Sequence, residues 1–166
     1  TYQSCNNACQ YCDANELRKT TLGRCGIIPN QQVVRMVDIK KLASWFDKAI
    51  RYDDFTNPFM NWAIRHKYFI ELGTTGEVFQ EEDLFFRTTY EFFKIANNYQ
   101  MPIFVNTKLN LLCYNEEYKK LLINHSAPII ICLTLTTVDD KLGKLYEPKA
   151  PLPSLRLKTI KELNEN

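Results

Sequence analysis

Three cysteines lie close together near the start of the sequence, with the spacing C-x3-C-x2-C: Cys5, Cys9 and Cys12. Thiolates are the usual protein ligands of iron–sulfur clusters. Three of them on one short loop can hold three irons of a [4Fe–4S] cube, which leaves the fourth iron without a protein ligand. An open position is typical of catalytic metal sites, whereas structural sites are closed. The spacing therefore predicts an iron–sulfur cluster that can bind a further ligand.

The same cysteines allow other interpretations. In a structural zinc site Cys25 would be the fourth ligand, although zinc sites usually combine two closely spaced pairs and Cys25 stands alone. The thiols could also hold no metal. A disulfide framework is less expected, because six cysteines in 166 residues are a modest density and Cys113 and Cys132 lie in apolar segments. The zinc alternative predicts a non-catalytic module in which the metal fixes the N-terminal loop.

The composition sets broad limits on the class of protein. A chain of 166 residues corresponds to one domain, and 45% hydrophobic residues can form a sizeable core. The net charge of +2, with both signs mixed, gives no electrostatic indication of nucleic-acid binding. No apolar run approaches the roughly 18 residues of a membrane-spanning helix. Free thiols without a targeting segment predict a reducing, cytoplasmic location and no membrane association.

Apolar periodicity predicts alternating strands and helices after the cysteine loop. Strands are expected at residues 67–72, 102–107 and 128–135. The last of these is expected to be buried on both faces, because its hydrophobic run is unbroken. Helices are expected at residues 38–53, 81–99 and 115–123, and after an N-cap at Ser154. Because a parallel connection needs a crossover, this alternation predicts an α/β fold with a parallel sheet.

Polar residues follow each expected strand. They are Thr74, Thr75, Gly76 and Glu77 after the first strand, Lys108 after the second, and Thr134 and Thr136 at the end of the third. Each has an ordinary alternative: a turn, a solvated lysine, or threonines that satisfy backbone groups. Ligands of parallel α/β sheets bind at the carboxyl ends of the strands, however. We therefore expect these residues and the thiol loop to meet at one rim.

Four motifs in a fixed order cover nearly the whole chain. The first is C-x3-C-x-Y-C, in which Tyr11 precedes the last cysteine. GTTGEVFQEED and VNTK follow, and the last is LTTVDDKLGKLYEPKAPLPSLRLKTIKEL, which contains Glu147 and Arg156. Together they resemble the cluster loop and the segments after the second, third and fourth strands of radical S-adenosylmethionine (SAM) enzymes related to spore photoproduct lyase.

This resemblance implies that residues 1–166 are a radical SAM core domain, a partial (β/α) barrel truncated to about four β/α units. The first strand would be nearly absent, because only residues 1–4 precede Cys5, and the last two β/α units would be missing. The chain is accordingly expected to be a fragment or truncated copy of a longer enzyme. Cys5, Cys9 and Cys12 would ligate the cluster, and Tyr11 would pack near the SAM adenine.

The resemblance also implies how SAM is held. Residues 74–77 would meet its amino group, and Lys108 would lie near its carboxylate, which is a favourable charge pairing. Thr134 and Thr136 would face SAM or the substrate. Glu147 and Arg156 match the motif without an assigned chemical role, and a structural ion pair is equally open.

In the implied reaction the reduced cluster cleaves SAM to a 5′-deoxyadenosyl radical, which abstracts hydrogen from an unknown substrate. A lyase or DNA photoproduct repair activity is suggested by the group, so a nucleic-acid substrate rests on family analogy alone. An electron donor such as flavodoxin or ferredoxin is the implied partner.

Overall fold

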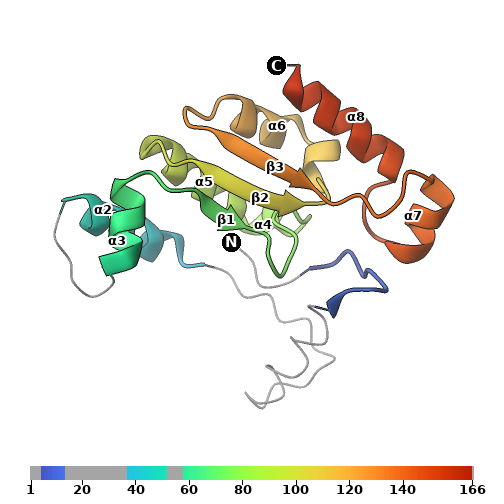
Figure 1. Ribbon diagram of the computed structural model, residues 1–166, viewed down its shortest axis with the longest axis horizontal. Helices are drawn as coiled ribbons and strands as arrows, with labels where there is room; N and C mark the ends of the chain where they lie inside the picture. Colours follow the sequence, from blue (N-terminus) through green and yellow to red (C-terminus); the bar gives the residue numbers. More distant parts are fainter. Residues whose placement is uncertain (1–4, 14–36, 52–57, 166) are drawn as a thin grey trace, which may run out of the picture.

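The computed structural model describes residues 5–13, 37–51 and 58–165 (Figure 1). Their centre is a parallel sheet of three strands in the order β1-β2-β3, so the expected parallel pairing is present. The strands are β1 (Ile70–Leu72), β2 (Ile103–Thr107) and β3 (Ile129–Leu133). In this register Ile70, Ile103 and Ile129 lie side by side. The carboxyl ends of all three strands therefore reach the same edge of the sheet.

Helices precede, connect and follow the three strands. They are α2 (Ile39–Arg51), α3 (Pro58–Arg65), α4 (Asp83–Phe86), α5 (Thr88–Asn98), the 3-10 helix η1 (Leu111–Cys113), α6 (Glu116–Ile123), α7 (Asp140–Tyr146) and α8 (Pro153–Asn164). The expected cap of α2 is present, since Asp38 accepts the amides of Lys40 and Lys41. No helix in the described ranges has the length and apolar character needed to cross a membrane.

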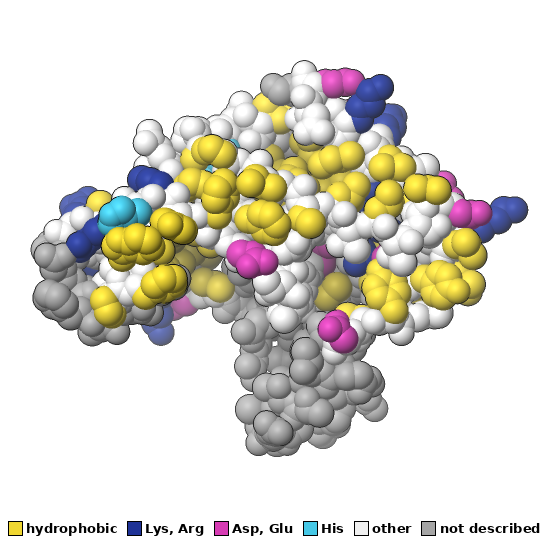
Figure 2. All heavy atoms as spheres, in the orientation of Figure 1, with side chains coloured by type: hydrophobic (Ala, Val, Ile, Leu, Met, Phe, Trp, Pro, Cys, Tyr) yellow, Lys and Arg dark blue, Asp and Glu magenta, His cyan; other side chains and the backbone are white. Residues whose placement is uncertain are grey.

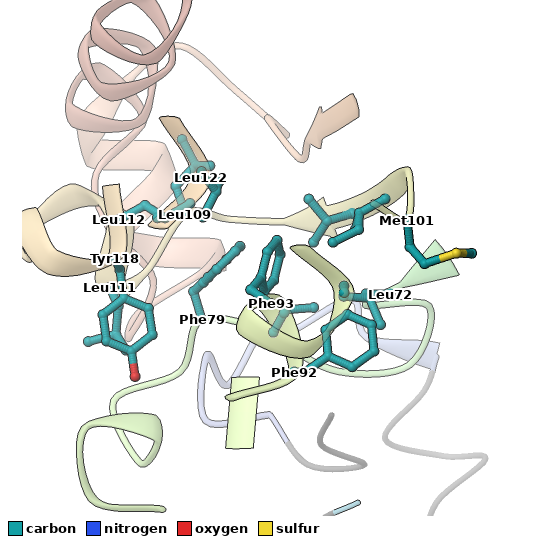
Figure 3. Packing of buried hydrophobic residues seen from close by; sticks show 14 of the residues in the cluster. Leu72, Phe79, Phe92, Phe93, Met101, Leu109, Leu111, Leu112, Tyr118 and Leu122 are labelled. Carbon is teal, nitrogen blue, oxygen red and sulfur yellow. The ribbon is translucent and has the colours of Figure 1, made fainter. Parts of the chain in front are cut away.

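The hydrophobic core lies between one face of the sheet and helices α5 and α6 (Figure 3). Phe93 of α5, Ile103 of β2 and Tyr118 of α6 are completely buried in it. Removing one such side chain from water stabilises the fold by about 1.5–3 kcal/mol. The core therefore fixes β2 against its helices and, with it, the position of the loop that follows β2.

Strand β3 differs from its expected double burial. Ile129, Ile131 and Leu133 pack against the core, whereas Ile130 is 46% exposed and Cys132 is exposed. The reason is that, in the described part of the chain, the core helices cover only one face of the sheet. Figure 2 looks onto the other face and shows hydrophobic side chains gathered over the strands.

The single helix expected at 81–99 is also wrong, because the chain breaks between α4 and α5. Arg87 adopts a left-handed conformation with φ +56°. The buried Asp83 carboxylate accepts the amides of Thr89 and Tyr90, so it caps α5 from the preceding helix. Apolar spacing continues across the break, which is why periodicity alone did not indicate it.

The cap expected at Ser154 is wrong as well. Helix α8 begins at Pro153 after Leu152, and Ser154 lies inside its first turn. The Ser154 amide and hydroxyl donate instead to Asp140 of α7, at 2.9 and 2.6 Å. Asp139 caps α7 in turn by accepting the amides of Lys141 and Leu142. Two successive aspartates thus fix the turn between these helices.

Candidate functional site

A cavity of about 460 Å³ opens at the carboxyl edge of the sheet. The cysteine loop, the loop after β1 and the ends of β2 and β3 line it. Every site residue expected from the sequence contributes to the lining except Thr136: Cys5, Cys9, Tyr11, Cys12, Thr74, Thr75, Gly76, Glu77, Lys108 and Thr134. Thr136 lies next to this set, because its hydroxyl is 2.8 Å from the Tyr11 hydroxyl. Segments far apart in the sequence thus meet around one space.

Buried amides hold the first half of the cysteine loop. Asn7 is 1% exposed, and its side chain donates to Glu77 at 3.4 Å and accepts from Asn110 at 2.6 Å. The neighbouring Asn6 donates to Glu82 at 3.2 Å. These contacts attach the loop to the segments after β1 and β2.

The second half of the loop contacts the C-terminal part of the chain. The Gln10 amide donates to the Tyr146 carbonyl at 2.9 Å, and the Lys149 amide donates to the Asn7 carbonyl at 3.3 Å. Between these points Ala8 has a left-handed backbone with φ +53°. The loop is therefore attached both to the segments after β1 and β2 and to residues 146–149.

Glu77 has little capacity left for a ligand. Its Oε1 accepts from the Phe79 amide and the Thr107 hydroxyl, and its Oε2 accepts from Asn7 and the Lys108 amide. A carboxylate offers about four lone-pair sites. Glu77, which is 3% exposed, consequently shapes the loop. Thr74, Thr75 and Gly76 of the same loop also line the cavity.

Gly73, directly after β1, lies close to the backbone of β2. Its φ is +82°, and a Cβ built there would lie 2.0 Å from the Asn106 carbonyl oxygen. Such an approach is possible only for glycine. Beside it, the side-chain amide of Asn106 donates to the Glu71 carboxylate at 3.1 Å, and both residues line the cavity.

A second buried carboxylate lies on the other side of the loop. Glu147 is 1% exposed and accepts hydrogen bonds from Tyr11, Thr136 and Arg156. The Lys108 ammonium is 3.7 Å from the same carboxylate. The ion pair left open for Glu147 and Arg156 is thus present. The sequence motif located Glu147 but gave no sign of its contacts with Tyr11 and Lys108.

These contacts set the charges around the cavity. Burial alone would raise the pKa of Glu147, but hydrogen bonds from Tyr11, Thr136 and Arg156 outweigh it and lower that pKa. Burial, and then the hydrogen bond to Glu147, raises the pKa of Tyr11. Burial also raises the pKa of Cys9, partly opposed by the nearby Lys108 charge. The positive charge of Lys108 thus favours the Cys9 thiolate that a metal would bind.

Two kinds of metal centre place different demands on the three thiols. Among residues 5–13, 37–51 and 58–165, no group of three histidine, cysteine, aspartate or glutamate side chains is placed to hold one metal ion. A zinc ion needs its sulfur ligands about 2.3 Å from a common point. In a cube each thiolate binds a different iron, so the ligands surround a larger body. Cys5, Cys9 and Cys12 all line one cavity, so the thiol donor set that a cluster would use is present there.

Cys25, the fourth ligand of the zinc alternative, lies outside the described residues. Comparison of the chain with models of protein families, with curated proteins and with solved structures finds no match in any of the three.

Proposed function

We propose that this chain is the core of a radical SAM enzyme, in which Cys5, Cys9 and Cys12 hold a [4Fe–4S] cluster and the adjoining cavity binds SAM. One observation carries the proposal. The cysteine loop lines the same cavity as the polar residues at the ends of three parallel strands, as ligand binding by such a sheet requires. When bound, the cluster would supply the electron that cleaves SAM to a 5′-deoxyadenosyl radical.

The chain's own residues bind and orient the cofactor. The Lys108 side chain is 14% exposed and lies at the cavity, where it can pair with the SAM carboxylate. Its ammonium is 5.8 Å from the centre of the Tyr11 ring, so both groups face one region. Thr74, Thr75 and Gly76 are available to the SAM amino group. Glu77 keeps their loop in place through its bonds to the neighbouring segments.

The remaining parts of the proposal follow the family. The sheet would belong to a partial (β/α) barrel whose helices lie outside, with its open face turned to the interior. The enzyme would work in the cytoplasm with flavodoxin or ferredoxin as its electron donor. Its substrate class, DNA photoproducts included, is set by analogy alone.

The test is anaerobic reconstitution with iron and sulfide, followed by EPR of the reduced protein with and without SAM. We expect a [4Fe–4S] signal that changes when SAM is added. The signal should be lost in Cys9→Ala and kept in Cys25→Ala. Cys113→Ala is a matched control, because Cys113 is a half-buried thiol outside the loop. A colourless protein that binds one zinc ion and loses it in Cys25→Ala would overturn the proposal.

A further inference from the structure

One buried carboxylate joins four separate segments of the chain. Glu147 accepts from Tyr11 of the cysteine loop, from Thr136 after β3 and from Arg156 of α8, and it pairs with Lys108 after β2. We propose that Glu147 is a positioning residue that fastens the cysteine loop to the α7–α8 unit and directs Tyr11 and Lys108 at the cavity. No part of the proposed chemistry assigns it this role.

The two oxygens of Glu147 have different partners. Oε2 accepts from Arg156, which is completely buried and also donates to the Pro151 and Thr134 carbonyls at 2.7 and 2.9 Å. Arg156 therefore neutralises the carboxylate and fixes its orientation. Oε1 is left for Tyr11, Thr136 and Lys108. One oxygen thus belongs to the scaffold, and the other faces the site.

Two backbone hydrogen bonds join the same segments as the Tyr11–Glu147 bond. The Gln10 amide donates to the Tyr146 carbonyl, and the Lys149 amide donates to the Asn7 carbonyl. The two bonds run between the same pair of segments, residues 7–10 and 146–149. The Tyr11–Glu147 bond adds the side-chain contact that fixes one segment along the other.

The contacts of Glu147 matter because Tyr11 and Lys108 each need a partner to hold one conformation. Tyr11 is 48% exposed, so packing restrains its ring only in part. A lysine has several rotatable bonds and needs a partner to hold one direction. A common acceptor places the Tyr11 ring and the Lys108 ammonium together before any ligand arrives, which reduces the cost of binding. This consequence for SAM rests on the proposed function, whereas the fastening of the loop does not.

The first test is hydrogen exchange of the Gln10 amide in the metal-free protein. Tyr11→Phe removes only the hydroxyl and should speed this exchange about tenfold, because local opening becomes easier. Tyr99→Phe is the matched control, since Tyr99 donates a similar hydroxyl bond to Asp47 at 2.6 Å and precedes β2, at the amino edge of the sheet rather than at the rim that holds the loop. It should leave the Gln10 amide unchanged. Equal effects of the two variants, or no effect of Tyr11→Phe, would overturn the proposal.

A second variant and a second readout separate this proposal from the proposed function. Glu147→Gln weakens the acceptor and should speed the same exchange. In that background Tyr11→Phe should have a smaller effect than in the wild type, and fully additive effects would count against the shared contact. In reconstituted protein, Tyr11→Phe should raise the SAM concentration for half of the EPR change about tenfold at equal iron content. If this SAM concentration is unchanged, Tyr11 has no part in positioning SAM. If wild-type protein binds no cluster, the proposed function fails while the exchange result still decides on the fastening.

Discussion

Two buried glutamates, one on each side of the cysteine loop, give the candidate site its shape. Glu77 and Glu147 are 3% and 1% exposed, positions where an unpaired carboxylate would be costly. Donors from the loop pay part of that cost in both cases: Asn7 bonds Glu77, and Tyr11 bonds Glu147. The loop and the two acids therefore stabilise one another, and Cys9, the thiol between Asn7 and Tyr11, is positioned as a result.

Glu147→Gln is expected to make the free energy of unfolding less sensitive to acid. Hydrogen bonds hold the pKa of Glu147 below its ordinary value, so its stabilisation is complete above about pH 4.3 and is lost as the pH falls through the lower folded-state pKa. The substitution leaves Arg156 buried without its counter-charge, which costs about 3–5 kcal/mol near neutral pH. Urea unfolding at about pH 7 and about pH 3 measures the difference between variant and wild type at both values.

The expected result is a difference that shrinks at the lower pH. Lys108, Tyr11 and Arg156 also face this carboxylate. A difference that stays constant, or grows, on acidification would contradict a lowered pKa for Glu147. Exposed Glu117, replaced by Gln, controls for the loss of any ion pair, since it pairs with Arg87 at the surface.

At the residue scale, the sequence indicated which side chains lie at the site but not how they are connected. Cysteine spacing and strand-end positions are local properties, so Cys9 and Lys108 could be placed at one rim in advance. The Asn7–Asn110 and Tyr11–Glu147 bonds join residues more than a hundred positions apart. No local pattern encodes such a pairing.

At the scale of elements, periodicity predicted where helices and strands occur but not what ends them. The apolar spacing of residues 81–99 has no gap, yet the chain turns at Arg87. Asp83 makes the turn favourable by capping α5, and Arg87 is held by Glu117 and by the Tyr90 ring, whose centre lies 3.6 Å away. A carboxylate near a helix start is also expected in an unbroken helix, so the sequence could not distinguish the two cases.

The cap at Asp83 is expected to contribute more than an ordinary one. Asp83→Ala should lower the free energy of unfolding by about 2–4 kcal/mol, because it uncaps α5 and leaves the buried Tyr118 hydroxyl without that acceptor. Asp139 is an exposed cap that also accepts two backbone amides. Asp139→Ala should lower the free energy of unfolding by about 1 kcal/mol. Urea unfolding of both variants gives the comparison. Equal losses would mean that the break at Arg87 does not depend on Asp83.

At the scale of the whole molecule, the described sheet has one face packed by helices and one face open. Glu71, Phe104 and Ile130 are neighbours across the three strands on the open face. The cavity adjoins this face, since Glu71 and Asn106 belong to its lining. Binary patterning could not predict the open face, because an apolar strand such as β3 is compatible with burial on one side or on both.

The open face is expected to make this chain self-associate. Ile130 is 46% exposed on this face, and exposed apolar patches favour association. Ile130→Lys should shift sedimentation toward the monomer and change the free energy of unfolding by less than about 1 kcal/mol, because its side chain is already partly in water. Val138→Lys is the matched control, since Val138 is 73% exposed in the segment before α7, away from the strands. Association lowered equally by both variants would point to net charge as the cause, and association unchanged by Ile130→Lys would show that this face does not attract a second copy.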